Sequence, residues 1–346
     1  MNKLVKFFPL AAIAAGLFTF TACGTSDDTI YIYTPHESNR IELFKTELNN
    51  HFPDYKIDVK YQETGTIKSK LAAEGKNISC DIIVGIEITN AEIILNDNPD
   101  VFADLSDYDT SIYVDEVLEY QHDVVLSDGT TRQGHKKYHI QDKEAGCVMI
   151  NTKVLQEKGL AEPESYADLL KPEYKNLIVM PNPNSSGTGY YFYNGYASVH
   201  GVDAAKDYFR ALADNVKEFS SSGSGPTRGV TSGEIAIGLG MHFQAREAAN
   251  KNPDIKIKWF EEGSPYTLYT MAMVNGKETK KGVKEVYDYF YSHVNYLDNS
   301  KIVPETIYKN PLDPEVPNWV TPDKYTPMRG LLDPKYKQDL LEAWDW

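Results

Sequence analysis

Strand-like and helix-like segments alternate along this chain, and that alternation limits the folds open to it. Residues 29–33 read Thr-Ile-Tyr-Ile-Tyr, a β-branched and aromatic strand, and residues 34–38 stop it and open a helix that runs to about residue 50. Strands at 56–61 and 81–84, with a helix at 67–74 between them, continue the pattern. Alternation at this spacing is typical of right-handed βαβ units on a parallel sheet. The sequence therefore predicts an α/β fold.

The same rhythm restarts after Asn151, which predicts a second lobe. Its expected elements are strands at 177–180 and 235–239 and helices at 189–199, 204–213 and 226–232. A strand at 146–151 leads into this lobe, and a strand at 267–274 with a helix at 281–294 returns to the first. No low-complexity linker separates the two, so we expect crossing strands that act as a hinge. The predicted lobes are residues 29–151 plus 266–295, and residues 152–265 plus 296–346.

The first residues carry the features of an export signal, residues 1–22. Lys3 and Lys6 precede an apolar run at 7–20 that is short for a membrane helix. Cys23 then heads a polar tether, residues 23–28. Small residues before a single Cys resemble the lipobox of bacterial lipoproteins, which implies a lipidated Cys23; a free Cys after an ordinary signal peptide is the alternative. We expect an exported protein, lipid-anchored to the membrane and facing the periplasm or the cell exterior.

Net charge limits the classes of partner, and two cysteines remain after Cys23. The chain has a formal net charge of −15, and removing residues 1–22 takes away two lysines and leaves −17. An acidic surface of this kind disfavours nucleic acid and anionic lipid as partners. Cys80 and Cys147 both lie in apolar, strand-like runs, where either a disulfide or two buried thiols would fit an exported protein.

Two stretches resemble a known family. The first runs from Gly159 through Tyr-Ala-Asp-Leu-Leu-Lys-Pro-Glu-Tyr at 166–174 to Ser-Gly-Thr-Gly at 186–189, and the second is Gly-Glu-Ile-Ala-Ile-Gly at 233–238. They are similar to the family 1 extracellular solute-binding proteins of bacterial ABC importers, in the branch that binds ferric ions, phosphonates and sugar phosphates. That resemblance implies a periplasmic-binding-protein-like fold of type II: two α/β lobes, a hinge of crossing strands and a solute in the cleft. It also implies a receptor, not an enzyme, that serves an ABC permease and its ATPase. We expect a monomer without a cofactor or a resident metal.

Two Ser/Gly loops of the second lobe have the character of an anion site. Each precedes a helix, and the free N–H groups of a helix N-terminus attract anions. Glycines in such a loop let an anion approach the backbone, although a simple capped turn would show the same residues. The predicted ligand residues in these loops are Ser186, Gly187, Thr188, Gly189, Ser221, Ser222 and Gly223.

Polar residues of the first lobe fall where strands end, and should face those loops across the cleft. Thr34 and His36 follow the first strand, Thr66 the second, and Glu87 the third. Glu87 is a candidate partner for a ligand amine, but a solvated carboxylate is the commoner outcome. His36 could donate to an anion, bind metal or cap a helix, and capping is the interpretation that we favour.

The expected solute is a small anion, a phosphonate or a sugar phosphate or other organophosphate. Ferric members of the branch hold iron with adjacent tyrosines after the Gly-Glu strand, whereas this chain reads Gly-Met-His-Phe-Gln at 240–244, so His242 is the candidate ligand residue there. Ferric iron or an iron chelate is therefore the second hypothesis. A hydrolase is a distant third, because the chain lacks Gly-x-Ser-x-Gly, His-Glu-x-x-His and a phosphate-binding loop.

Overall fold

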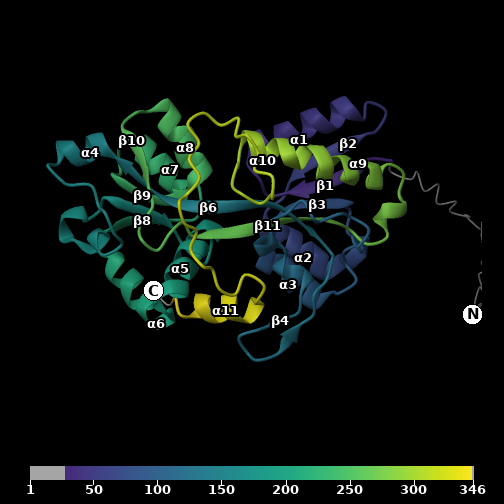
Figure 1. Ribbon diagram of the computed structural model, residues 1–346, viewed down its shortest axis with the longest axis horizontal. Coiled ribbons are helices and arrows are strands. Elements are labelled where there is room, and N and C mark those ends of the chain that lie inside the picture. Colours follow the sequence, from purple (N-terminus) through teal and green to yellow (C-terminus); the bar gives the residue numbers. More distant parts are fainter. Residues whose placement is uncertain (1–27, 345–346) are drawn as a thin grey trace, which may run out of the picture.

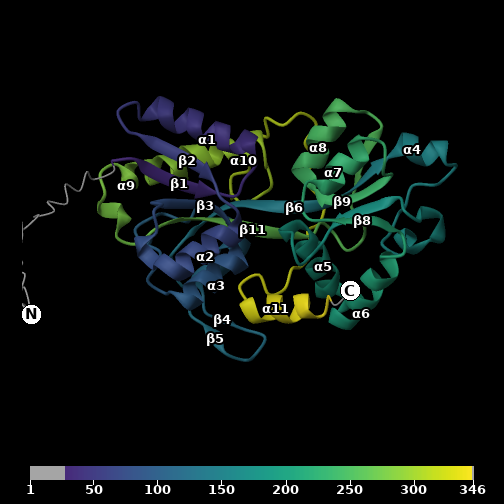
Figure 2. The same ribbon diagram turned by 180° about the vertical axis from the view of Figure 1, so that it is seen from behind.

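The two predicted lobes and their crossing strands are present in the computed structural model, which describes residues 28–344. Figures 1 and 2 show two α/β lobes side by side, with β6 (His139–Asn151) and β11 (Tyr266–Met273) running from one to the other. Within the described residues a single nine-stranded sheet spans both lobes, in the order β2-β1-β3-β11-β6-β9-β7-β8, with β10 also paired to β6. The predicted α/β fold with a strand hinge is thus confirmed.

The first lobe is built from βα units with parallel strands, as its alternation predicts. β1 pairs in parallel with both β2 and β3, and buried aliphatic side chains such as Ile32 fill the space between sheet and helices. The elements are β1 (Ile30–Thr34), α1 (Ser38–His51), β2 (Ile57–Tyr61), α2 (Thr64–Glu74), β3 (Ile82–Glu87), α3 (Ile88–Asp97), and a small hairpin of β4 (Val124–Val125) and β5 (Thr131–Arg132).

The hinge consists of the two antiparallel strands β6 and β11, and β6 pairs with strands of both lobes. The first half of β6 pairs with β11, and β11 pairs in turn with β3 of the first lobe. The second half of β6, from Gly146 to Ile150, pairs with β9 of the second lobe. Every residue of β6 is buried. The lobes therefore share one strand rather than a flexible linker.

The second lobe repeats the α/β architecture, with β7 parallel to β8 and β9. Helix α6 shows why such helices pack: Ala205, Tyr208, Phe209 and Leu212 form one buried face at helical spacing. The elements are α4 (Thr152–Glu157), β7 (Ile178–Pro181), α5 (Gly187–His200), α6 (Val202–Leu212), β8 (Val216–Ser220), α7 (Gly225–Thr231), β9 (Ile237–Met241), α8 (His242–Lys251) and β10 (Ile255–Lys258).

The C-terminal part of the chain contacts both lobes. It comprises α9 (Val283–Tyr289), a π-helical turn (Phe290–Val294), α10 (Asn295–Lys301) and α11 (Pro334–Glu342). In α10, Asn299 donates a hydrogen bond of 2.8 Å to the backbone of Gln141. Leu332 lies in a core cluster of the first lobe, whereas Leu340 and Trp344 lie in that of the second. Figure 1 shows α11 between α5 and α3, across the gap between the lobes. The lobe boundaries given above stay predictions.

Two further features concern export and redox state. Cys80 and Cys147 are free thiols buried in different core clusters, so the disulfide alternative is not what this structure contains. Burial raises the pKa of the Cys80 thiol to about 12. No helix within residues 28–344 has both the length and the apolar character needed to cross a bilayer. Cys23 and the signal segment lie outside the described residues.

Candidate functional site

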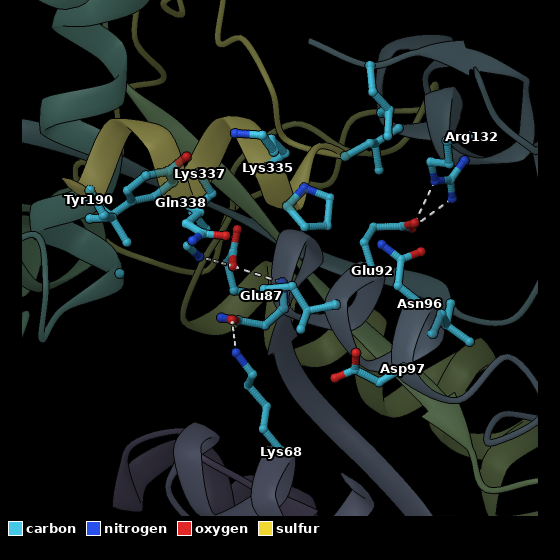
Figure 3. A pocket seen from close by; sticks show the side chains of 18 of the residues that line it. Lys68, Glu87, Glu92, Asn96, Asp97, Arg132, Tyr190, Lys335, Lys337 and Gln338 are labelled. Carbon is cyan, nitrogen blue, oxygen red and sulfur yellow. Dashed lines mark hydrogen bonds and ion pairs between the residues drawn. The ribbon is translucent and has the colours of Figure 1, made fainter. Parts of the chain in front are cut away.

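A cleft of about 1410 Å³ lies between the two lobes and α11. The first lobe contributes residues of α2 and α3, the second lobe the loop that leads into α5, and the C-terminal segment one side of α11. Figure 3 shows Lys337 of α11 joined to Glu87, and Lys68 of α2 on the opposite side, where it bonds to Asn90. Tyr269 of the hinge strand β11 also lines the cleft. The site thus combines all three parts of the molecule.

The N-terminus of α5 opens into this cleft. Ser186 is the N-cap, and its Oγ accepts a weak hydrogen bond of 3.5 Å from the backbone N–H of Gly189. Gly187 lines the cleft, and a Cβ placed on it would meet only the Tyr269 hydroxyl, at 3.5 Å. A Cβ on Gly189 would instead lie 2.4 Å from the carbonyl oxygen of Pro181. Gly187 therefore faces the open space, whereas Gly189 allows α5 to pack closely against β7.

The second Ser/Gly loop packs behind the first and does not line the cleft. A Cβ on Gly223 would lie 2.3 Å from the hydroxyl oxygen of Thr188, so the two loops touch at this point. Ser222 shares a hydrogen bond of 3.1 Å with Ser224, and its carbonyl accepts one of 2.9 Å from the Ser220 hydroxyl. The second loop therefore packs against the start of α5 and is not part of the cleft wall; its predicted ligand residues are Ser221, Ser222 and Gly223.

Glu87 lines the cleft and serves as the N-cap of α3. Its Oε1 accepts from the backbone and hydroxyl of Thr89 and from the Thr267 hydroxyl, at 2.9–3.2 Å. Its Oε2 accepts from the backbone of Asn90 at 3.2 Å and from Lys337 Nζ at 2.7 Å. Burial works against ionisation, but the Lys337 ammonium and these donors outweigh it and lower the pKa of Glu87. Glu87 is therefore an ionised side chain whose oxygens are already occupied.

His36 and Thr34 lie inside the protein at the hinge rather than on the cleft wall. The Thr34 hydroxyl accepts from the backbone of His36 at 3.3 Å. His36 accepts from Arg40 at Nδ1, at 3.0 Å, and donates from Nε2 to Gln141, at 2.9 Å. Burial and the Arg40 charge lower the pKa of His36, so the ring is neutral. Thr66 is exposed on α2, and it is Thr64 and Lys68 of that helix that line the cleft.

Arg40 centres a buried ion cluster that the sequence did not reveal. Its guanidinium donates to Asp142 and Asp298, and to Glu144 at 3.0 Å. Asp142 and Glu144 belong to β6, and Asp298 to α10. Burial raises the pKa of Asp142 to about 6, although the Arg40 charge lowers it, and the Asp298 charge adds to the rise. The cluster ties α1, α10 and the hinge strand together.

His242 is the first residue of α8, directly after β9, and its side chain is buried. Its Nδ1 donates to Glu305 at 2.7 Å, and its ring lies between Trp259 and Trp319, with centroid separations of 4.9 and 4.1 Å. His242 Nε2 is buried and has no hydrogen-bond partner among the described residues. Like His36, His242 does not line the cleft.

Sequence reasoning missed the cleft cations and tyrosines. Lys68 donates to Asn90 at 3.0 Å, and burial together with the nearby Lys337 lowers its pKa. Tyr190 and Tyr269 line the cleft from α5 and β11. Lys68 lies two residues after the predicted Thr66 on the same helix, so the strand-end argument could have found it. No pattern in the residues around Lys337 predicts a place in the cleft, because that place depends on the path of the C-terminal segment through the fold.

The comparison of sequences gives a family and several relatives. Residues 105–321 match the family described as bacterial extracellular solute-binding protein. An uncharacterized protein of Haemophilus influenzae is 30% identical over 297 residues, which cover 84% of this chain and 80% of that protein. The spermidine/putrescine-binding periplasmic protein of Salmonella typhimurium is 27% identical over 207 residues, 54% of this chain and 55% of that protein.

Solved structures share the fold at low sequence identity. AfuA of Actinobacillus pleuropneumoniae, a periplasmic binding protein with fructose-6-phosphate bound, has a TM-score of 0.66 and 20% identity, over 79% of this chain and 82% of that one. Iron-bound HitA of Pseudomonas aeruginosa has a TM-score of 0.69 and 14% identity, over 91% of this chain and 97% of that one. The predicted type II periplasmic-binding-protein fold is thereby confirmed. The chain belongs to the bacterial extracellular solute-binding proteins, the non-enzymatic receptors of ABC importers.

Proposed function

We propose that this receptor captures a small anionic solute, a phosphonate or a sugar phosphate or other organophosphate, and delivers it to an ABC permease and its ATPase. The observation that carries the proposal is the N-terminus of α5, which opens into the interlobe cleft at Gly187, where no Cβ blocks the backbone. A 14-residue helix presents free N–H groups and the positive end of its dipole at that point. Phosphoryl oxygens are well suited to such a site.

The cleft is less acidic than the chain as a whole, because its lining carries as many basic as acidic side chains. They are Lys68, Arg132, Lys137, Lys335 and Lys337 against Glu87, Glu92, Asp97, Asp128 and Glu342. The mature chain would carry −17 after removal of two lysines from a formal −15, so its overall field repels anions. Lys68 brings a cation from the first lobe into the cleft. A solute held by α5 of one lobe and attracted by Lys68 of the other would favour closure of the lobes, because it binds the closed form better.

The predicted ligand residues take two roles in this proposal. Ser186, Gly187 and Glu87 line the cleft and are the proposed wall of the binding site. Thr66 is exposed on α2 and takes no part in the wall. The remaining predicted residues hold the loops and the hinge away from the cleft surface: Thr34, His36, Thr188, Gly189, Ser221, Ser222, Gly223 and His242. The fructose-6-phosphate bound to AfuA supports the choice of solute class, since that protein shares the fold.

Iron or an iron chelate is the second candidate. The His242 imidazole donates to a carboxylate and keeps Nε2 without a partner among the described residues, an arrangement frequent in metal-binding histidines. HitA, which binds iron, also shares the fold. Against it, Met241 and His242 stand where ferric proteins of the branch have tyrosines, and no three His, Cys, Asp or Glu side chains of residues 28–344 gather as a metal site. A tyrosinate-to-iron absorption band on adding ferric citrate would promote this candidate.

The place of the receptor at the membrane is also part of the proposal. The segment before the described residues contains Ala-Cys-Gly at 22–24, which supports a diacylated Cys23 as the anchor of a monomeric receptor. One acylated terminus with two chains suffices for stable attachment. Such an anchor would hold the receptor near the permease. We propose no nucleic-acid partner for this acidic chain.

Calorimetric titration of the purified protein tests the solute class. Fructose 6-phosphate, glycerol 3-phosphate, methylphosphonate and inorganic phosphate would be compared with fructose and glycerol as uncharged controls. We expect at least one phosphorylated or phosphonate compound to bind and its uncharged counterpart to show no heat of binding. Equal binding of charged and uncharged compounds, or binding of none of the anions, would contradict the proposal.

A further inference from the structure

The C-terminal helix α11 brings a lysine into the cleft from the far end of the chain. Lys337 Nζ lies 2.7 Å from Glu87 Oε2 and 4.6 Å from the ring centroid of Tyr190, and only 12% of the side chain is exposed. Figure 3 shows Lys337 and Tyr190 on the same side of Glu87. A lysine held in this way is part of the cleft wall and not a surface charge.

The helix that carries Lys337 is fixed to both lobes. Asp333 caps α11 by accepting from the backbone of Tyr336 at 3.0 Å, and it also accepts from the backbone of Ser127 at 2.6 Å, in the first lobe. Leu340 packs into the core of the second lobe. The position of the Lys337 ammonium group therefore depends on the relative position of the two lobes. This is expected of a residue whose contacts change when the lobes close.

Two polar groups beside the N-terminus of α5 retain bonding capacity. An ammonium group has three donors, and the bond to Glu87 uses one of them. The Tyr190 hydroxyl is buried and has no partner among the described residues, although it belongs to the cleft lining. Burial and the nearby Glu87 charge raise the pKa of Tyr190, so it remains a neutral donor. Both groups are donors, and an anion is the ligand that would satisfy them.

We propose that Lys337, assisted by the Tyr190 hydroxyl, binds the anionic group of the solute that α5 holds. The inference rests on the proposed function and adds the C-terminal helix to the recognition site. Glu87 is then the counter-ion that keeps Lys337 in place while the cleft is empty, and it competes with the solute for the same ammonium. Two residues that form one ion pair should thus affect solute binding in opposite directions.

Opposite signs make the inference testable with Lys337→Gln and Glu87→Gln in the mature, full-length protein. Calorimetry with fructose 6-phosphate and inorganic phosphate should show binding about 10- to 150-fold weaker in Lys337→Gln, since one charge-assisted bond is lost. Glu87→Gln should bind several-fold tighter, because the competing charge is gone while an oxygen remains to cap α3. Lys337→Arg should retain most of the affinity.

Lys251→Gln is the control and should bind like wild type, because Lys251 lies outside the cleft lining, is 72% exposed and pairs with Glu247 on its own helix, α8. A merely structural Lys337–Glu87 pair would make both Gln variants lose affinity and thermal stability together. That result, or a Lys337→Gln variant whose affinity is within twofold of wild type, would overturn the inference without affecting the proposal that the wild-type protein binds anions. If the wild-type protein bound no anion, the proposed function itself would fail.

Discussion

Replacing Gly187 by Asp places a carboxylate where the solute anion is proposed to bind. The structure allows the change, because a Cβ at this position meets only the Tyr269 hydroxyl at 3.5 Å, an ordinary contact. Gly187 is also the first residue of α5, where a negative charge stabilises a helix by about 0.3–1 kcal/mol. The variant should therefore fold at least as stably as wild type, and a loss of binding could not be attributed to unfolding.

The size of the effect follows from Coulomb repulsion at the helix N-terminus. Two unit charges about 5 Å apart at an effective dielectric constant of about 20 repel by about 3 kcal/mol. That energy corresponds to roughly a 150-fold weaker affinity, since about 1.4 kcal/mol is a factor of ten. Gly187→Asn has nearly the same shape without the charge and should lose far less. Gly187→Ala should bind within a few-fold of wild type.

Calorimetry of the three variants with a phosphorylated solute, together with their melting temperatures, provides the assay. The expected order of affinity is wild type, Ala, Asn and then Asp, with melting temperatures that do not fall in the same order. Retained binding in Gly187→Asp, or equal losses in Asn and Asp, would refute the reasoning that the amides of α5 hold the anion.

Three further predictions concern folding and location. Gly189→Ala should lower the free energy of unfolding in urea by about 1–3 kcal/mol, because its Cβ would lie 2.4 Å from the carbonyl oxygen of Pro181; an unchanged midpoint would contradict that packing. The folded pKa of Asp142, about 6, exceeds the value of about 4 for an unfolded chain, so the folded state holds this proton to higher pH. Wild-type stability relative to Asp142→Asn should therefore fall as pH rises from about 4 to about 6, and a parallel pH profile for the two would count against it. Cys23→Ser should move the protein to the soluble fraction or leave it unprocessed, whereas unchanged membrane association would exclude the lipid anchor.

The parts of the fold that could be predicted are those whose pattern is local. The apolar run of β3 and the buried face of α6 reveal a strand and a helix from their own residues. The first half of β6 reads His-Ile-Gln-Asp-Lys-Glu and has no strand pattern. Its buried carboxylates are compensated by Arg40, about a hundred residues earlier, and its buried lysine by Glu116. A buried charge whose partner lies this far away in the sequence cannot be recognised from the neighbouring residues alone.

The residues of the candidate site likewise divide into those with a local sequence pattern and those without one. The Ser/Gly loop before α5 could be found because strand, loop and helix N-terminus are consecutive in sequence. Lys337 could not, because it reaches Glu87 across 250 positions of the chain. His36 was correctly placed at the end of β1, yet its neighbours Arg40 and Gln141 bury it away from the cleft. The expected capping role for His36 stays a prediction.

Native mass spectrometry of the protein purified from its own cells tests most directly the claim that the cleft captures an anionic solute. The account predicts a retained, non-covalent adduct that releases phosphate or a phosphonate on fragmentation and that is absent from the Gly187→Asp variant. A retained polyamine or uncharged sugar, held equally by wild type and Gly187→Asp, would contradict it.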